Sequence, residues 1–146
     1  MGNEVIFHPA YWGGKKLCHP HVPPEAGKFS QSVVVDNLIF VSGCQGQNDE
    51  TLTISDDFVE QMNTALEKVR KAMETAGSCM DNVIKTAILL KDVADYPVMR
   101  RTELEFYQKC APKLVEDPPA STLMEVGLDK PEYLVEIEVI GVMSRG

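Results

Sequence analysis

The chain has 146 residues, 44% of them hydrophobic and 25% charged, as expected for a single globular domain over 1–146. Its formal net charge of −8 disfavours nucleic acid as a partner, because phosphate backbones are bound by Lys and Arg and no basic run offsets the acidic excess. No segment approaches the length of a membrane span and the first residues lack a secretory signal pattern, so we expect a cytoplasmic protein.

The N-terminal part of the chain is predicted to contain an edge strand at 4–7 and an ordered loop over 9–28. The prolines of the loop exclude a helix or a central strand. The loop contains Cys18, His19 and His21, whose spacing matches no standard zinc site and leaves a fourth ligand missing, so we predict no bound metal. We interpret the histidines as surface residues; the alternative is a pH-sensitive or substrate-facing role for His19 or His21.

Two β-rich runs, at 31–35 and 38–44, are separated by a pair of turn-forming residues, which predicts a β-hairpin. The second run ends in Ser42-Gly43-Cys44, and a glycine at this point lets a ligand or another backbone approach closely. Cys44 has no adjacent base, so we interpret it as a small buried hydrophobe rather than a reactive thiol.

Two amphipathic helices are predicted on either side of a central strand. The first spans 55–76, where apolar residues recur at helical spacing, and Ser55 is positioned to cap it. The strand spans 83–90, which is short and rich in β-branched residues. The second helix runs from Asp95 to a stop at Pro112, followed by a connector over 113–119.

The C-terminal stretch contains two further β-rich runs, at 120–126 and 134–142. Residues two apart on a strand share a face, so Glu136 and Glu138 are expected on one face and the intervening apolar residues on the other. A wet face or an edge strand would explain the two carboxylates. The alternative is a site in which one carboxyl group transfers protons, and burial together with Glu138 would raise the pKa of Glu136.

These elements predict an α+β fold with a single mixed sheet of about six strands and both helices packed on one face. The opposite face would then carry apolar side chains such as Ile140. A monomer rarely exposes such a patch, so we expect self-association that buries this face.

The motifs VSGCQG, AGSCMDNVIKTAILLKDVADY, ASTLMEVGL and VEIEVIG follow one another along most of the chain and together resemble the Rid family, also called YjgF or L-PSP. The resemblance implies a chorismate-mutase-like fold that assembles as a homotrimer, with a cleft between each pair of subunits. It also implies hydrolysis of reactive enamines and imines to keto acids and ammonia. We predict no cofactor, because neither a phosphate-binding glycine loop nor a metal-ligand pattern is present.

Five positions correspond to cleft residues of the family. The resemblance makes Glu136 the carboxylate that engages the attacking water. It implies that Ser42 and Gly43 line the cleft with their backbone atoms. Phe29 stands where many members have tyrosine, and Thr122 at a position often held by Cys or Thr, so both are predicted to contact the substrate.

Ala120 is the main departure from the family pattern. Imine-deaminating members carry an arginine there, whose planar guanidinium pairs with the substrate carboxylate. Either this protein takes a different ligand, or another cation reaches the cleft. Arg100 is the candidate replacement, a hypothesis that requires its side chain to point toward Glu136; a solvated pair with Arg101 is the favoured interpretation.

Three functions therefore remain open. The first is a small-molecule enzyme of the Rid type, such as an enamine or imine deaminase (a hydrolase) with an altered substrate. The second is a non-catalytic trimer that binds small metabolites in the same clefts. The third is the endoribonuclease activity that L-PSP labels attach to the family, which the net charge of −8 disfavours.

Overall fold

A computed structural model describes residues 4–8, 15–19 and 29–144 of the chain. Its main sheet contains strands β1 (Glu4–His8), β2 (Lys15–His19), β3 (Ser32–Val35), β4 (Leu38–Gln45), β7 (Val83–Leu90), β8 (Ala120–Glu125) and β9 (Val135–Val142). Across the sheet the order is β1-β2-β3-β4-β9-β7-β8. A separate two-stranded ribbon pairs β5 (Gln47–Asn48) with β6 (Thr53–Ile54).

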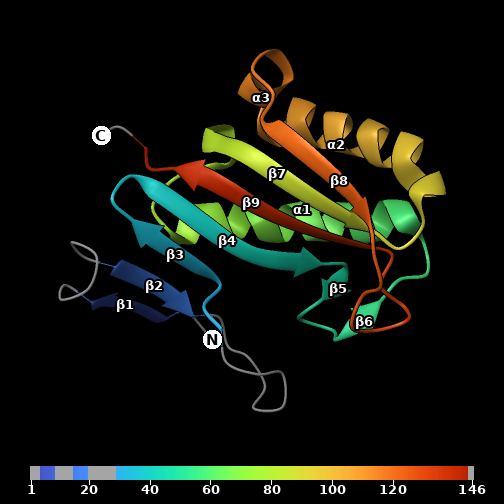
Figure 1. Cartoon of the computed structure of the whole chain (residues 1–146), viewed down its shortest axis with the longest axis horizontal. Coiled ribbons are helices and arrows are strands. Elements are labelled where there is room, and N and C mark those ends of the chain that lie inside the picture. Colours follow the sequence, from blue (N-terminus) through green and yellow to red (C-terminus); the bar gives the residue numbers. More distant parts are fainter. Residues whose placement is uncertain (1–3, 9–14, 20–28, 145–146) are drawn as a thin grey trace.

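Two long helices, α1 (Phe58–Thr75) and α2 (Tyr96–Cys110), cover one face of the main sheet (Figure 1). Helix α1 packs across β4 and β9, and α2 lies beside α1. The predicted α+β fold, with both helices on one face of a mixed sheet, is thus confirmed. None of the helices in the described ranges has both the length and the apolar character needed to span a bilayer.

Strand β9 lies inside the sheet between β4 and β7 and is antiparallel to both. Helix α1 therefore connects two strands, β4 and β7, that run parallel to each other with β9 inserted between them. Strand β8 pairs in parallel with β7 on the far side. Although β8 and β9 follow each other along the chain, β7 separates them in the sheet.

The alternation expected for β9 is confirmed. Val135, Ile137 and Val139 are buried beneath the helices, whereas Glu136 and Glu138 point to the uncovered face. The core under that face is built from large apolar side chains of the two long helices and the central strands, including Ile39, Met62, Leu66, Val69, Met73, Ile88, Leu90 and Met99. Burying one face of each strand leaves the other to form a site.

Helix α1 begins later than predicted. Its N-cap is Asp57, whose Oδ2 accepts a hydrogen bond from the Glu60 backbone amide at 2.9 Å. Ser55 lies too far back to bond this amide; its hydroxyl instead donates to the Glu60 side chain at 2.5 Å. The helix ends where Gly77 adopts a φ of +97°, a conformation that favours glycine.

The prediction of an ordered loop over 9–28 is wrong for Lys15–His19, which forms strand β2 between β1 and β3. No proline falls within these five residues, so each can donate its amide to a neighbouring strand. His21 lies outside the described residues. The connector predicted over 113–119 contains a one-turn helix, α3 (Lys113–Glu116).

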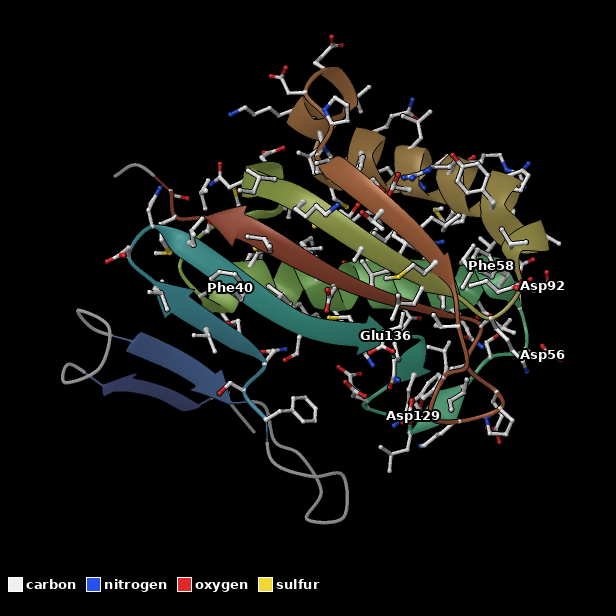
Figure 2. The ribbon with its side chains drawn as sticks, viewed as in Figure 1. Phe40, Asp56, Phe58, Asp92, Asp129 and Glu136 are labelled. Carbon is white, nitrogen blue, oxygen red and sulfur yellow. The ribbon has the colours of Figure 1, made fainter. Side chains whose placement is uncertain are left out.

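The uncovered sheet face carries exposed apolar side chains, as expected. Leu38 and Phe40 on β4 are 39% and 43% exposed, and Met124 on β8 is 45% exposed. Phe40 and Glu136 are both labelled on their strands in Figure 2. Ile140 on β9 is half-buried. Leu38, Phe40 and Ile140, on the paired strands β4 and β9, form an apolar patch on the same face as the site described next.

Candidate functional site

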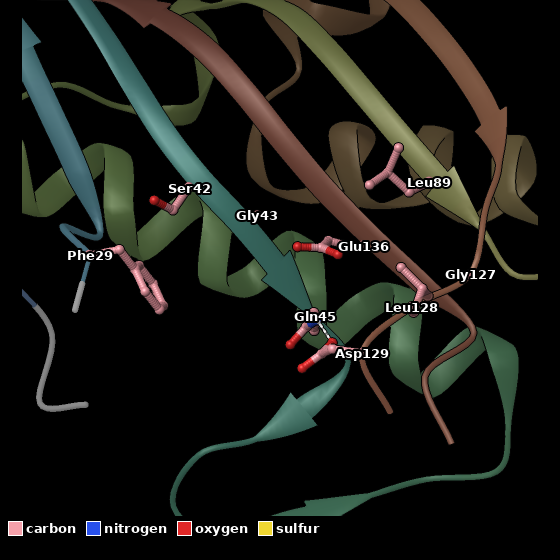
Figure 3. A pocket seen from close by; sticks show the side chains of 9 residues that line it. All are labelled: Phe29, Ser42, Gly43, Gln45, Leu89, Gly127, Leu128, Asp129 and Glu136. Atoms are coloured by element: carbon pink, nitrogen blue, oxygen red, sulfur yellow. Dashed lines mark hydrogen bonds between the residues drawn. The ribbon is translucent and has the colours of Figure 1, made fainter. Parts of the chain in front are cut away.

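A cavity of about 440 Å³ opens on the uncovered face, where β4, β9 and β7 lie side by side. It is large enough for a small metabolite. Figure 3 shows the side chains that surround it. Its lining residues are Phe29, Ser42, Gly43, Gln45, Leu89, Gly127, Leu128, Asp129 and Glu136.

Glu136 lies at the centre of this lining. On β9 it is paired with Gln45 of β4 on one side and with Leu89 of β7 on the other. The β4–β9 pairing is interrupted between Val41 and Cys44, where two residues of β4 stand opposite one residue of β9. Such a bulge bends the strand and re-aims neighbouring groups, and it places Ser42 and Gly43 at the rim of the cavity.

A glycine is required at position 43 because the side chain of Glu136 lies against its backbone. A Cβ atom at this position would lie 2.0 Å from Oε1 of Glu136 and 2.8 Å from its Cδ. Any larger residue therefore displaces the carboxyl group. The glycine and the carboxylate are 93 positions apart in sequence, by subtraction of their numbers, but they form one structural unit.

We expect Gly43→Ala to lower the activity of the protein by about 10- to 100-fold, because a displacement on the order of 1 Å at a reacting group has effects of this size. Gly127→Ala is the matched control, since Gly127 lines the same cavity but a Cβ there meets nothing within 4 Å. Steady-state rates of both variants, with circular dichroism as a check of folding, test the expectation. Equal rates for the two variants would contradict it.

The pKa of the Glu136 carboxyl is raised above its usual value, chiefly by burial. The negative charges of Asp129 and Glu138 raise this pKa further, while hydrogen bonding from the Gln45 side chain lowers it. Burial and Glu138 were expected to act in this direction; Asp129 is an additional cause. A carboxyl group with a raised pKa exchanges protons more readily near neutral pH.

Asp129 reaches the cavity from the segment between β8 and β9. The Gln45 side-chain amide donates to Oδ1 of Asp129 at 2.5 Å, drawn as a dashed line in Figure 3. The neighbouring Lys130 turns elsewhere, since its ammonium donates to Oε1 of Gln47 at 3.3 Å. Tyr133 donates to the same oxygen at 3.1 Å.

Four of the six predicted site residues come together around the cavity: Phe29, Ser42, Gly43 and Glu136. Phe29 is 51% exposed, and Figure 3 shows its ring beside the opening. The Ser42 hydroxyl donates to the backbone carbonyl of Ser30 at 2.6 Å, which ties the segment carrying Phe29 to β4.

Thr122 and Arg100 are not part of this lining. Thr122 shares the uncovered face but lies on β8, where its hydroxyl accepts a hydrogen bond from Lys85 at 2.6 Å. Arg100 lies on the helical side, donating to Glu103 at 2.8 Å and to the Ser121 hydroxyl at 2.9 Å. Its side chain points away from the Glu136 face, so the hypothesis that it replaces the missing guanidinium is dropped.

Cys44 is buried, and burial raises the pKa of its thiol to about 12. This agrees with its interpretation as a small hydrophobe, because the thiolate is the nucleophilic form. Within the described residues, no group of three or more His, Cys, Asp or Glu side chains is arranged to hold a metal ion. Proton transfer by a carboxyl group is the chemistry that this arrangement supports.

Sequence reasoning missed five lining residues: Gln45, Leu89, Gly127, Leu128 and Asp129. Gln45 and Leu89 could have been found from strand register, because each pairs with Glu136. Residues 127–129 follow β8 without a recognisable pattern, and only the path of this segment brings them to the cavity.

These features define a class of protein: a small α+β domain with a metabolite-sized cavity, built around one carboxyl group, on a sheet face that the helices leave uncovered. The family model described as "Endoribonuclease L-PSP" matches residues 20–143. The chain belongs to this family, the Rid, YjgF or L-PSP family that its motifs resemble.

Sequence comparison with individual proteins supports the same family. A RutC family protein of Pyrococcus abyssi is 31% identical over 141 residues, covering 96% of this chain and 97% of that protein. The 3-aminoacrylate deaminase RutC of Acinetobacter baylyi is 29% identical over 117 residues, covering 79% of this chain and 86% of its own.

Solved structures show the same fold. A YjgF family member from Neisseria meningitidis superposes with a TM-score of 0.70 at 22% identity and covers 98% of both chains. TdcF of E. coli, solved with bound serine, has a TM-score of 0.73 at 24% identity, covering 81% of this chain and 90% of its own.

Proposed function

We propose that the protein is a small-molecule enzyme of the Rid type that hydrolyses a C=N bond, with Glu136 as the group that moves protons. The observation that carries this proposal is the carboxyl group of Glu136, which lies in a cavity of about 440 Å³ against Gly43 and has a raised pKa. The relative named 3-aminoacrylate deaminase supports the reaction class.

Hydrolysis can proceed through one carboxylate. Glu136 accepts a proton from water as the water oxygen bonds to the carbon of a protonated imine, and the π pair moves to nitrogen. The carboxylic acid then returns the proton to that nitrogen. The C–N bond breaks with its electron pair on ammonia, and the hydroxyl proton passes to ammonia as the carbonyl forms. The sum is R₂C=NH₂⁺ + H₂O → R₂C=O + NH₄⁺.

The remaining lining residues position these reactants. Phe29 and Leu89 offer apolar contacts to the substrate and reduce the access of bulk water. Ser42 and Gly43 contribute backbone groups at the bulge beside the carboxyl group. Because Ala120 presents only a methyl group where imine-deaminating members have arginine, the substrate is expected to differ from theirs.

The decisive experiment measures ammonia release from imines generated in situ by a flavin oxidase, with and without the protein. Catalysis should raise the rate above that of uncatalysed hydrolysis, increase linearly with protein concentration and saturate with substrate. A rate equal to the uncatalysed one over a panel of imines would favour the second candidate function, a non-catalytic trimer that binds small metabolites in its clefts. The uncharged side chains of Phe29 and Leu89, which line the cavity on opposite sides of Glu136 (Figure 3), suit either role.

We further propose that the protein assembles as a homotrimer through the uncovered face, so that clefts form between subunits. The exposed Leu38, Phe40 and Met124 support self-association, because several large apolar side chains exposed on one sheet face are typical of an interaction surface. In such an assembly, Thr122 and Ala120 of one subunit could complete a cleft around Glu136 of another, which would give Thr122 the substrate contact expected from the resemblance.

Phe40→Glu is expected to lower the molar mass in solution from three chain masses to one, because it places a charge in the apolar patch. Leu104→Glu is the matched control, since Leu104 is equally exposed but lies on α2, on the opposite side of the sheet. Light scattering coupled to gel filtration measures the masses. A wild-type mass of one chain, or an unchanged mass for Phe40→Glu, would count against the assembly.

An endoribonuclease function receives no support from the geometry. The described lining of the cavity contains two carboxylates and no Lys, Arg or His, whereas RNA binding depends on cationic and aromatic surfaces. Nuclease activity that copurifies with the wild type and disappears in Glu136→Ala would reverse this conclusion.

A further inference from the structure

The cavity is acidic. Two of its lining side chains, Asp129 and Glu136, are carboxylates, and among the described lining residues there is no Lys, Arg or His. Neither carboxylate forms a salt bridge within the described part of the chain. A binding site with this charge favours a cation and opposes a carboxylate.

Asp129 is held in place by the protein. The Gln45 amide donates to its Oδ1, and Gln45 is itself fixed in strand β4, opposite Glu136. The bond therefore holds Asp129 beside Gln45, and Figure 3 shows the carboxylates of Asp129 and Glu136 on the lining of the same cavity. An exposed carboxylate without such a contact would have many conformations and would contribute little selectivity.

Three cationic side chains on or next to the elements around the cavity are bonded to other groups. Lys130 donates to Gln47, and Lys85 donates to Thr122 on β8, beside Ala120 in the parallel pairing. Arg100 is bonded to Glu103 and Ser121 behind the sheet. Since Ala120 supplies no charge either, no described residue of the same subunit compensates the two carboxylates of the cavity. In the proposed trimer, Lys85 would accompany Thr122 to the cleft of a neighbouring subunit, so its contribution is tested below by Lys85→Met.

We infer that the ligand of this cavity is a small cation without a carboxylate, namely the protonated imine of an amine, and that Asp129 determines this specificity. The inference rests on the proposed function and names its substrate class. Both the reactant R₂C=NH₂⁺ and the product NH₄⁺ carry one positive charge, so Asp129 faces a cation when the substrate binds and when ammonia forms, with a neutral carbinolamine between the two. Glu136 transfers the protons in the proposed steps, whereas Asp129 transfers none and serves as the counterion.

The binding experiment uses two probes with the same apolar tail and opposite charges, 3-methylbutylammonium and 4-methylpentanoate. Binding is measured by NMR titration at pH 7 to the wild type, Asp129→Asn and Asp56→Asn. The last variant removes the same charge from an exposed residue outside the cavity lining. We expect the ammonium to bind more tightly than the carboxylate, and Asp129→Asn alone to weaken its binding by about three- to ten-fold, as for one partly exposed charge pair.

The kinetic experiment compares imines of leucine and of 3-methylbutylamine, which differ by the carboxylate. They are generated in situ by an amino acid oxidase and a flavin amine oxidase. The amine-derived imine is expected to be the faster substrate, with Asp129→Asn lowering its kcat/KM and not that of the leucine-derived imine. A preference for the leucine-derived imine that is lost in Lys85→Met would overturn the inference and leave the proposed hydrolase intact.

Two further results separate the cation-site inference from the proposed hydrolase function. Tighter or equal binding of 4-methylpentanoate, or no binding of the ammonium, overturns the inference whatever the kinetics show. If neither imine is hydrolysed faster than without the protein, the proposed function fails, while selective binding of the ammonium that depends on Asp129 still upholds a cation site.

Discussion

Glu136→Gln is expected to lower imine hydrolysis by about 100- to 10,000-fold, the range for loss of a general acid–base group. The amide keeps the shape of the side chain against Gly43 but cannot accept a proton from water. The measurement is the rate of ammonia release, corrected for uncatalysed hydrolysis. Glu138→Gln is the control, because Glu138 lies on the same strand face and outside the described cavity lining.

The wild-type rate should fall as the pH decreases through the raised pKa of Glu136, above the usual value of 4.5, because the protonated carboxyl cannot act as a base. A rate that increases at acidic pH, after the same correction, would contradict this role. So would a Glu136→Gln variant that retains most of the wild-type rate.

The same substitution should not weaken the fold at neutral pH. A carboxyl whose folded pKa lies above its unfolded value stabilises the protein most when protonated, and this contribution is lost as the pH rises through the folded pKa. Glutamine removes that dependence for Glu136. We therefore expect the Tm of Glu136→Gln to equal or exceed that of the wild type at pH 7, with less advantage at pH 4, measured by calorimetry. Loss of activity without loss of stability separates a chemical role from a structural one.

Gln61→Met is expected to lower the free energy of unfolding by about 2–4 kcal/mol, the largest stability effect that we predict. Gln61 is fully buried in α1, and its amide donates to the carbonyls of Ser55 at 2.6 Å and Glu132 at 2.8 Å. Its Oε1 accepts from the Leu134 amide at 2.9 Å. Methionine has a similar length but satisfies none of these backbone groups.

Urea denaturation of Gln61→Met and of Asn63→Met tests this expectation, since Asn63 lies exposed on the same helix. A loss of less than about 1 kcal/mol for Gln61→Met would mean that water replaces the three bonds at little cost. Gln61 also fixes the segment that enters β9, so we expect the rate of imine hydrolysis to fall in the same variant.

Gln61 illustrates a limit of sequence reasoning. It occurs between apolar residues at helical spacing, so its burial could be inferred, but its three partners lie six, 71 and 73 positions away. Gly46 is a related case, because a Cβ there would lie 2.5 Å from the Cβ of Gln61. No local sequence pattern predicts this contact. The roles of Gln61 and Gly46 follow from contacts between segments that are far apart in the sequence.

Local patterns were sufficient for several elements. The run at 83–90 became β7 with the same bounds, because its β-branched residues suit a pleated, buried strand. The alternation of β9 correctly separated Glu136 from its buried neighbours. The family resemblance, carried by motifs in a fixed order, predicted that Phe29, Ser42, Gly43 and Glu136 line one site. The structure places all four in the lining of the cavity.

By itself, then, the sequence determined the α+β class, the helical periodicity, the faces of the strands and the carboxylate around which the site is built, since these follow from spacing and side-chain chemistry. Only the tertiary structure decided that β7 separates β8 from β9, that Arg100 lies behind the sheet, and that Asp129 joins Glu136 in an acidic cavity. The physical reason is that strand order and loop path depend on contacts between residues far apart in the chain, which local propensity does not specify.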